Sequence, residues 1–499
     1  MLTLIVKALG FLREVIVGYF GGTSAITDAY NISNTIPNFF FVVITQIIAI
    51  AFIPIFLSIK TNSGEQESNK FANKCLVLIL IITSIFSILM ALFPDFLTSI
   101  FASGMDAKTK EMSSQLLRIC CWSVIFQSFT IIFSSFLNAK KYFIPPILCG
   151  LILDVVTVVL FFVYSKSGNI IWIGLIQLLS CLLQAIMLGI YAHKAGFRII
   201  LDKNLFDKNI KKVLIVSIPA LISVGVYEIN VLVDKNFGSY FGTGSISSLS
   251  YAQTVNNLFY TLIVNSIIVV AYTSFSEMAA KNEKKEATRL LATSIKRILF
   301  ITIPLVFVVI LYSKDIITVL FMRGKFDAYS VDLTYKNLIC YVIGLPFLSL
   351  SFLAMRFLYA NRDYYVAILI STIGLLANTG FNFVSYYLTN FGPAGIAMAT
   401  SISSLLQTVL IYAYIKKKYG TSILNESGPL ILSSLITSIL LIPVVFAVNR
   451  LFFNVKIIYI TLPLEIIIVL CFYLLISFLS EAEALKEFKK FLLRKKEKK

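Results

Sequence analysis

The first apolar segment of the chain contains three ionisable side chains, Lys7, Arg13 and Glu14, in a stretch that is otherwise uncharged. Lys7 and Glu14 share one face of a helix, and Arg13 is displaced from that face by about 100°. An ionisable group inside a membrane-spanning helix costs about 2.5 to 3.5 kcal/mol on insertion scales, so it normally faces protein or water. We therefore expect one side of this segment to be wet and its ionisable residues to be candidates for function.

These residues also have plainer interpretations. Lys7 can extend to the aqueous rim of a membrane, where Glu14 would merely neutralise it, whereas Arg13 lies deeper and fits this interpretation less well. Asp28 follows the short loop after the first segment, where Thr27 and Asp28 could cap the next helix. Asp28 could equally form a gating ion pair with a basic group, so both alternatives stay open.

Oxygen-bearing side chains on later segments suggest a cation site. Asn378 and Asn382 are four residues apart and project from one helix face, and Asp234 and Thr400 lie on other apolar segments. One carboxylate among neutral oxygens suits a monovalent ion, so we predict a sodium site made by these four residues. Buried asparagines more often form hydrogen bonds between helices, which is the alternative. We predict Na⁺ or H⁺ as the coupling ion and no other cofactor.

The composition requires a membrane. Of the 499 residues, 58% are hydrophobic and only 14% are charged, and the mean hydropathy is +0.88. One soluble core cannot bury this much apolar surface, and the length of the apolar runs favours helices over strands. We predict an all-α polytopic membrane protein with about fourteen helices. The predicted segments are 1–20, 29–58, 75–98, 114–138, 144–164, 169–192, 212–234, 246–277, 297–319, 334–359, 364–388, 394–415, 429–448 and 457–479.

The distribution of charge predicts the topology. Lysine and arginine are concentrated in the loops on one side of the membrane and in a basic tail over 483–499, which places both termini in the cytoplasm by the positive-inside rule. The net charge of +18 then needs no nucleic acid, because basic loops suit anionic membrane lipids. We interpret 1–20 as a retained helix, since it has no pattern of a cleaved leader.

Several enzyme classes are disfavoured by the sequence. It contains neither HExxH nor a phosphate-binding GxxxxGKS or GxxxxGKT motif, and His193 is its only histidine, so we expect no enzymatic activity. The seven cysteines lie in or beside apolar segments without CxxC spacing. We expect them to be small buried residues rather than disulfides or metal ligands.

The chain also repeats itself with an offset of about 221 residues. Tyr19-Phe-Gly-Gly-Thr resembles Tyr240-Phe-Gly-Thr-Gly, and residues 138–142 resemble residues 360–364. Six predicted helices per period is an even number, so the two halves have the same orientation, and such transporters work by rocking one lobe against the other. The predicted parts are parallel six-helix lobes over 1–195 and 196–420, two accessory helices over 421–482, and the tail over 483–499.

Some of these residues form motifs that resemble a known family. Gly10-Phe-Leu-Arg-Glu14, Thr27-Asp-Ala29 and Ile36-Pro-Asn-Phe39 resemble the N-terminal signature of the MurJ/MviN lipid II flippase family, and similar matches such as Gly395-Ile-Ala-Met-Ala-Thr-Ser401 follow along the chain. The family belongs to the multidrug/oligosaccharidyl-lipid/polysaccharide (MOP) exporter superfamily. The resemblance implies a fourteen-helix flippase with a cationic central cavity, a lipid groove formed with the last two helices, and often an ion site in the second lobe.

The resemblance also implies roles for single residues. Arg13 and Asp28 match positions that the family uses in its cavity and gate, Lys7 stands where the family prefers arginine, and Asn38 lies in a matching motif. We expect Arg13, supported by Lys7, to face the space between the lobes and hold the pyrophosphate of the substrate. Asp28 is expected to compete for the same cation when the site is empty.

Two departures from the family pattern affect the substrate more than the fold. Phe41 and Thr254 occupy positions where the family usually has cavity arginines, so two bidentate anion-binding groups are lost. We predict a monomeric flippase for an undecaprenyl-pyrophosphate-linked glycan, either lipid II or a related exopolysaccharide or teichoic-type intermediate. The alternatives are a cation-coupled exporter of amphipathic small molecules on the same fold and a membrane scaffold without transport.

Overall fold

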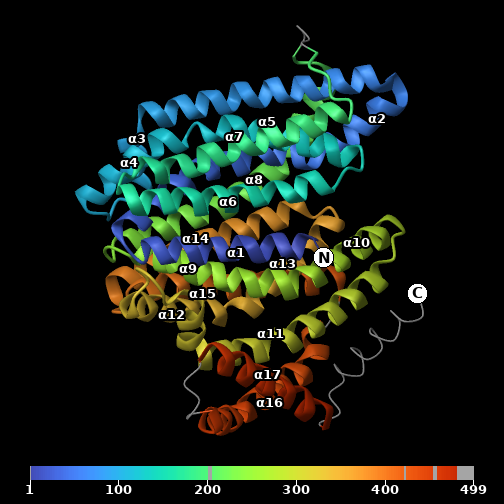
Figure 1. Cartoon of the computed structure of the whole chain (residues 1–499). Helices are drawn as coiled ribbons and strands as arrows, with labels where there is room; N and C mark the ends of the chain where they lie inside the picture. The colour runs from blue at the N-terminus through green and yellow to red at the C-terminus, as the bar shows by residue number, and fades with distance from the viewer. Residues whose placement is uncertain (1, 201–204, 421–422, 453–457, 480–499) are drawn as a thin grey trace. The chain divides into compact units, whose positions relative to one another are not determined.

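The computed structural model describes residues 2–200, 205–420, 423–452 and 458–479, and every regular element in these ranges is helical (Figure 1). The basic tail predicted over 483–499 lies outside the described residues. The helices are α1 (Leu2–Gly21), α2 (Ala25–Leu92), α3 (Pro94–Phe101), α4 (Ala107–Cys120), α5 (Ser123–Ala139), α6 (Ile144–Ser167), α7 (Ile171–Lys194), α8 (Lys208–Ser239), α9 (Ser245–Phe259), η1 (Tyr260–Val264), α10 (Asn265–Ala280), α11 (Lys284–Phe321), α12 (Ala328–Ile343), α13 (Leu345–Ala360), α14 (Tyr364–Leu388), α15 (Pro393–Tyr419), α16 (Ile423–Phe452) and α17 (Ile458–Leu479).

Each of the fourteen predicted segments falls on one of these helices or on a consecutive set, which confirms the predicted fold class. The segments 29–58 and 75–98 lie mainly on α2, which consists of two helical stretches that meet at the non-helical residue Gly64 (φ 88°, ψ 179°). Within the described residues, seven helices are long and apolar enough to cross a membrane, or up to nine if each of two bent pairs is one span. α1 fails that test of composition because it carries three charged residues.

The chain divides into two compact units. The N-terminal unit comprises Met1–Ser250 and Arg323–Ser330, and the C-terminal unit comprises Tyr251–Met322 and Val331–Lys499. α8 therefore packs with the N-terminal unit, along α2, although its sequence begins the second repeat. In the C-terminal unit α16 and α17 pack against α11, where the hydroxyl of Tyr473 donates to the carbonyl oxygen of Phe300 at 3.0 Å. The predicted lobe boundaries follow the repeat rather than these contacts, and they stay a prediction.

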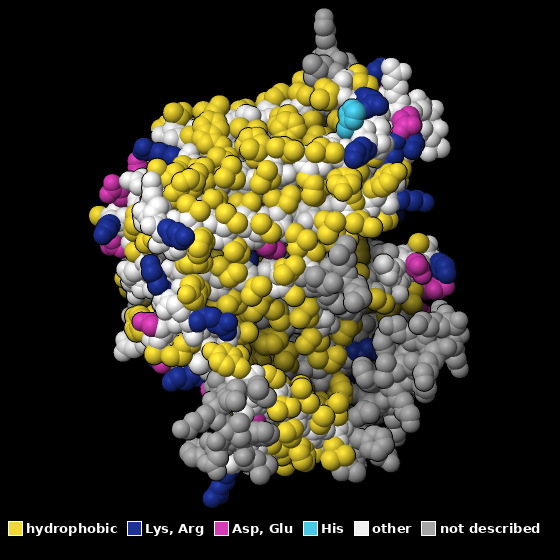
Figure 2. All heavy atoms as spheres, in the orientation of Figure 1, with side chains coloured by type: hydrophobic (Ala, Val, Ile, Leu, Met, Phe, Trp, Pro, Cys, Tyr) yellow, Lys and Arg dark blue, Asp and Glu magenta, His cyan; other side chains and the backbone are white. Residues whose placement is uncertain are grey.

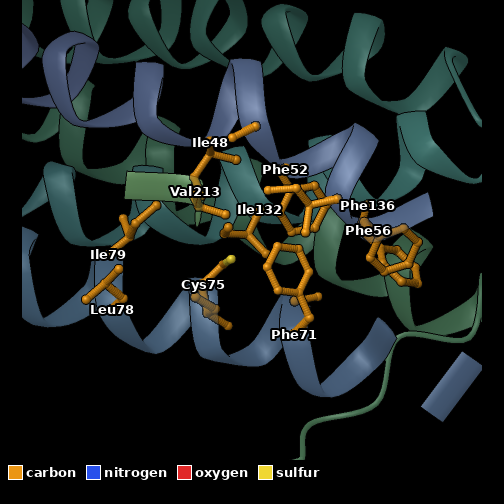
Figure 3. Close-up of a cluster of buried hydrophobic side chains, with 14 of the residues drawn as sticks. Ile48, Phe52, Phe56, Phe71, Cys75, Leu78, Ile79, Ile132, Phe136 and Val213 are labelled. Carbon is orange, nitrogen blue, oxygen red and sulfur yellow. The ribbon is translucent and has the colours of Figure 1, made fainter. Parts of the chain in front are cut away.

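A cluster of aromatic and aliphatic side chains holds the two halves of α2 together with α5 (Figure 3). The rings of Phe52 and Phe71, on opposite sides of the break in α2, lie 5.6 Å apart between centroids, and Phe56 meets Phe136 of α5 at 5.4 Å. Aromatic pairs at this separation stabilise a core beyond their buried area. Cys75 is buried in the same cluster, as expected for a small apolar residue (Figure 3).

The sequence repeat is also present in the local geometry. The pair α4–α5 bends by 44° and the pair α12–α13, at the equivalent place in the second half, bends by 46°. Each pair ends in the same turn, with a left-handed residue at equivalent positions, Lys141 (φ 66°) and Arg362 (φ 62°). Superposition of whole lobes stays a prediction, but the local repeat supports a duplicated helical unit.

The start of each bent pair is capped in the same way. The carboxylate of Asp106 accepts from the hydroxyl of Thr109 at 2.6 Å and from its amide at 3.1 Å, and Asp327 accepts from the amide and hydroxyl of Ser330, both at 2.8 Å. These hydrogen bonds favour the charged carboxylate, so they lower the pKa of Asp106, chiefly through the Thr109 hydroxyl, and the pKa of Asp327, chiefly through the Ser330 amide. Each cap fixes where the helix begins.

Candidate functional site

Arg13 lies in a cluster of opposite charges between α1 and α6. Its Nη2 is 2.7 Å from Oε1 of Glu14 on the same helix, and its Nη1 is 3.5 Å from Oδ1 of Asp154 on α6. The helices approach closely here, because a Cβ added at Gly150 of α6 would come within 3.1 Å of the Val6 side chain. The guanidinium is therefore already balanced by two carboxylates of its own unit.

The groove beside this ion pair is apolar and small. It has a volume of about 220 Å³, and Figure 2 shows charged side chains at one point amid the hydrophobic ones over α1 and α6. Sites for small-molecule ligands usually measure about 300 to 1,000 Å³, so this groove is too small for a glycan headgroup. The residues that line it are Leu9, Leu12, Arg13, Ile16, Leu151, Asp154, Val155, Val158 and Val159.

Lys7 and Asn38, the other predicted anion-binding residues besides Asp28, are both exposed. Neither forms an ion pair or a side-chain hydrogen bond with the residues that the structure describes, so no contact joins Lys7 to Arg13. Their roles in binding stay predictions.

Asp28 is buried, with only 2% of its surface exposed. It lies in the first turn of α2, and its carboxylate accepts hydrogen bonds from the amide of Gly244 at 2.6 Å and from the amide of Ser247 at 2.7 Å. These amides belong to the first turn of α9 and the loop before it, where a helix N-terminus favours negative charge. Main-chain amides that precede and begin another helix are therefore the partners of Asp28 in this conformation, and its expected competition for the Arg13 cation stays a prediction.

Asp28 is part of a larger set of contacts that we call the loop-end cluster, made by the loops 22–24, 102–106, 240–244 and 322–327 with the helix ends that flank them. The amide of Lys325 donates to the carbonyl oxygen of Tyr19 at 2.8 Å, and the hydroxyls of Thr23 and Ser330 lie 2.8 Å apart. Gly324 (φ 62°) is needed here, because a Cβ would clash with the Tyr19 carbonyl group.

The loop after α3 joins the same cluster. The amide of Gly104 donates to the hydroxyl of Ser239 at 2.9 Å, and the hydroxyls of Ser103 and Tyr240 lie 2.7 Å apart. A Cβ at Gly104 would lie 2.6 Å from the Cα of Tyr240, so only glycine permits this approach. Segments more than 130 residues apart in the sequence are thus joined at one end of the N-terminal unit.

The sequence analysis did not consider Lys235 of α8, which lies one residue beyond the predicted segment 212–234. Its ammonium donates to the hydroxyl of Thr35 on α2. Glu14, Glu228 and Asp28 act on it electrostatically, but among the described residues no carboxylate lies within the 4.0 Å of an ion pair. Lys235 directly follows Asp234, which the sequence analysis considered only as a cation ligand, and the proximity of Lys235 to α2 could not be read from the sequence.

Three of the four predicted sodium ligands are neighbours in the C-terminal unit. The Asn382 amide donates to Oδ1 of Asn378 at 2.9 Å, and the Asn378 amide donates to the hydroxyl of Thr400 on α15 at 3.3 Å. The bond from Asn378 to Thr400 joins α14 to α15, which is the interhelical role left open as the alternative. Asp234 belongs to the other unit, so the four-residue sodium site stays a prediction.

Phe41 has a packing role at the position where arginine was expected. With Phe40 it packs against a buried cluster that contains Ile32, Ile36 and Met90, so the substitution of an apolar ring fits the local core. Thr254 lies partly buried on α9 in the C-terminal unit.

The fold and these charged residues define a class of membrane transporter. A solved structure described as the inward-facing conformation of a multidrug resistance MATE family transporter of the MOP superfamily matches with a TM-score of 0.70 at 12% identity, covering 83% of this chain and 94% of the other. At that identity the likeness shows the fold alone. The chain therefore shares the helical fold of this MOP superfamily structure.

The family follows from the sequence. Residues 16–467 match the family described as lipid II flippase MurJ, and the chain belongs to this family. A probable lipid II flippase MurJ of Rickettsia prowazekii is 27% identical over 433 residues, or 86% of this chain and 84% of the relative, and one of Treponema pallidum is 24% identical over 437 residues, or 85% and 81%. A structure of lipid II flippase MurJ in an inward closed conformation matches with a TM-score of 0.82 at 25% identity, covering 97% and 98%.

Proposed function

We propose that this protein moves lipid II, an undecaprenyl-pyrophosphate-linked glycan precursor of peptidoglycan, across the bacterial cytoplasmic membrane. The observation that carries the proposal is its membership of the lipid II flippase family over residues 16–467. The structural likeness to an inward closed flippase over nearly the whole chain supports it. Phe41 and Thr254 alter the set of cavity cations, so the substrate's pyrophosphate has to be held by other groups.

The mechanism we propose is alternating access. The topology predicted from basic loops places the termini in the cytoplasm, so the loop-end cluster lies on the outer side of the membrane. Its hydrogen bonds, above all those of buried Asp28, hold that side closed while substrate enters from the cytoplasm. Release of the substrate to the outer side requires these hydrogen bonds to break. Their number and strength therefore set the ratio of molecules with the outer side closed to molecules with it open.

The coupling ion is part of the same proposal. Binding of an ion would drive the empty protein back to the state that faces the cytoplasm. The ion would be either a proton on one of the buried carboxylates or a sodium ion held by Asp234, Asn378, Asn382 and Thr400. The support from the structure is limited to the three neighbouring residues of α14 and α15. We further propose that the protein works as a monomer.

A genetic experiment tests the proposed substrate. The chain is expressed in a bacterium whose own lipid II flippase is depleted, and growth is followed together with the amount of lipid II in the membrane. We expect growth to be restored and the accumulated lipid II to fall. Normal membrane levels of the protein with no rescue, joined to a change in susceptibility to amphipathic drugs, would favour the small-molecule exporter instead.

A further inference from the structure

Arg13 of α1 and Lys235 of α8 differ in how firmly they are held. Arg13 faces two carboxylates, Glu14 at 2.7 Å and Asp154 at 3.5 Å. Lys235 faces the neutral hydroxyl of Thr35, and no carboxylate of the described residues lies within 4.0 Å of it. An incoming anion competes with two negative charges for Arg13 but with only one neutral hydroxyl for Lys235, so it displaces Thr35 more easily than it displaces the two carboxylates.

The surroundings of Lys235 leave it ready to bind. The Thr35 hydroxyl donates its proton to the carbonyl oxygen of Asn31 at 2.6 Å. Its oxygen can therefore accept a hydrogen bond from Lys235 at the same time. An ammonium has three donors, and this bond uses one of them. Asn31, Thr35 and Asn38 recur at helical spacing on one face of α2, which places neutral polar groups on the face that Lys235 meets.

The nearby acidic residues do not cancel this availability. Neither Glu14 nor Glu228 forms an ion pair with Lys235, so neither carboxylate occupies its donors. Glu14 accepts hydrogen bonds from Arg13 instead.

We infer that Lys235 is the residue that first binds the phosphate groups of a polyprenyl-pyrophosphate substrate, and that Arg13 engages only after its carboxylates are displaced. The identity of the natural substrate rests on the proposed function. The role of Lys235 itself requires only that the ligand is an amphipathic pyrophosphate. Lysine acts on such a ligand as a point charge, so an arginine at the same position preserves binding. Glutamine keeps a hydrogen-bond donor for Thr35 and removes the charge.

Binding is measured with farnesyl pyrophosphate as the probe. The dissociation constant is obtained by titrating the thermal stability of the purified full chain, as wild type and as Lys235→Gln, Lys235→Arg and Lys212→Ala. Lys212 is an exposed lysine near the cytoplasmic start of α8, so Lys212→Ala is the matched control. We expect Lys235→Gln to weaken binding at least about tenfold, which corresponds to about 1.4 kcal/mol, and Lys235→Arg and Lys212→Ala to stay within about threefold of wild type.

The outcomes separate this inference from the proposed function. Equal binding by Lys235→Gln and wild type, or no binding of the probe by wild type, would overturn the role of Lys235. If wild type binds the probe through Lys235 but does not move lipid II in liposomes, the inference stands and the proposed substrate is wrong. Thermal stability without ligand shows whether each variant is folded, and Lys235→Arg supplies a folded test of charge if Lys235→Gln is unstable.

Discussion

The hydrogen bonds of Asp28 should set how firmly the loop-end cluster is closed. In Asp28→Asn the side chain keeps its shape but loses its charge, and one of the two amides of Gly244 and Ser247 then faces an NH₂ group instead of an oxygen. A hydrogen bond to a charged group contributes about 1.5 to 3 kcal/mol, and burial prevents water from replacing it. At about 1.4 kcal/mol per factor of ten, the ratio of closed to open molecules should fall by about 10- to 100-fold.

A disulfide trap measures this ratio. The hydroxyl oxygens of Thr23 and Ser330 lie 2.8 Å apart, so cysteines at both positions place their sulfurs within reach of a disulfide in the closed state. In a background without the native cysteines, Thr23→Cys with Ser330→Cys should cross-link rapidly under mild oxidation. Adding Asp28→Asn should slow the reaction in proportion to the fraction of closed molecules, which falls as the ratio of closed to open molecules falls.

The control is Asp207→Asn, which alters a carboxylate that accepts from the amides of Asn209 and Ile210, both at 2.9 Å, at the start of α8 and outside the loop-end cluster. It should leave the cross-linking rate within about twofold of the parent. Equal rates for Asp28→Asn and the parent would refute the reasoning, because they would show that these two bonds do not control closure.

Three further predictions concern the charged and polar sites. Arg13→Ala should abolish lipid II transport at normal membrane levels, whereas Lys7→Arg should preserve it within about twofold; transport by Arg13→Ala would remove this cation from the mechanism. Asp154→Asn should tighten pyrophosphate binding by up to about fivefold, because a partly exposed ion pair such as Arg13–Asp154 contributes about 0.2 to 1 kcal/mol. Weaker binding would contradict the idea that Asp154 restrains Arg13 from binding the anion. Replacing Na⁺ by K⁺ should slow wild-type transport but not that of Asn378→Ala, and equal slowing would place the ion elsewhere.

The helices could be predicted from the sequence because a long apolar run in a bilayer can satisfy its backbone hydrogen bonds in few structures other than a helix. The exception is instructive. The polar residues between 58 and 75 stay helical on both sides of Gly64, whose non-helical φ and ψ break α2, so the two predicted segments are parts of longer helical stretches that meet at Gly64. Hydropathy marks where a chain can cross a membrane, but it does not mark where a helix ends.

The candidate site was harder to predict than the fold. Asp28 could be recognised as important, but its partners are main-chain amides, which carry no residue type that a motif can reveal. Arg13 was recognised as an intramembrane cation, but its pairing with Asp154 depends on the packing of α1 against α6. Lys235 was missed because its contact with Thr35 joins positions 200 residues apart. In each case the missing information was tertiary.

The central claim is that this chain translocates lipid II, and transport by the purified protein tests it most directly. The full chain is reconstituted into liposomes that carry fluorescently labelled lipid II, and the fraction of label accessible to an impermeant quencher is followed over time. We predict that the wild type moves lipid II between leaflets faster than protein-free liposomes do, and that Arg13→Ala does not. Folded wild-type protein whose label stays in its original leaflet would contradict the account.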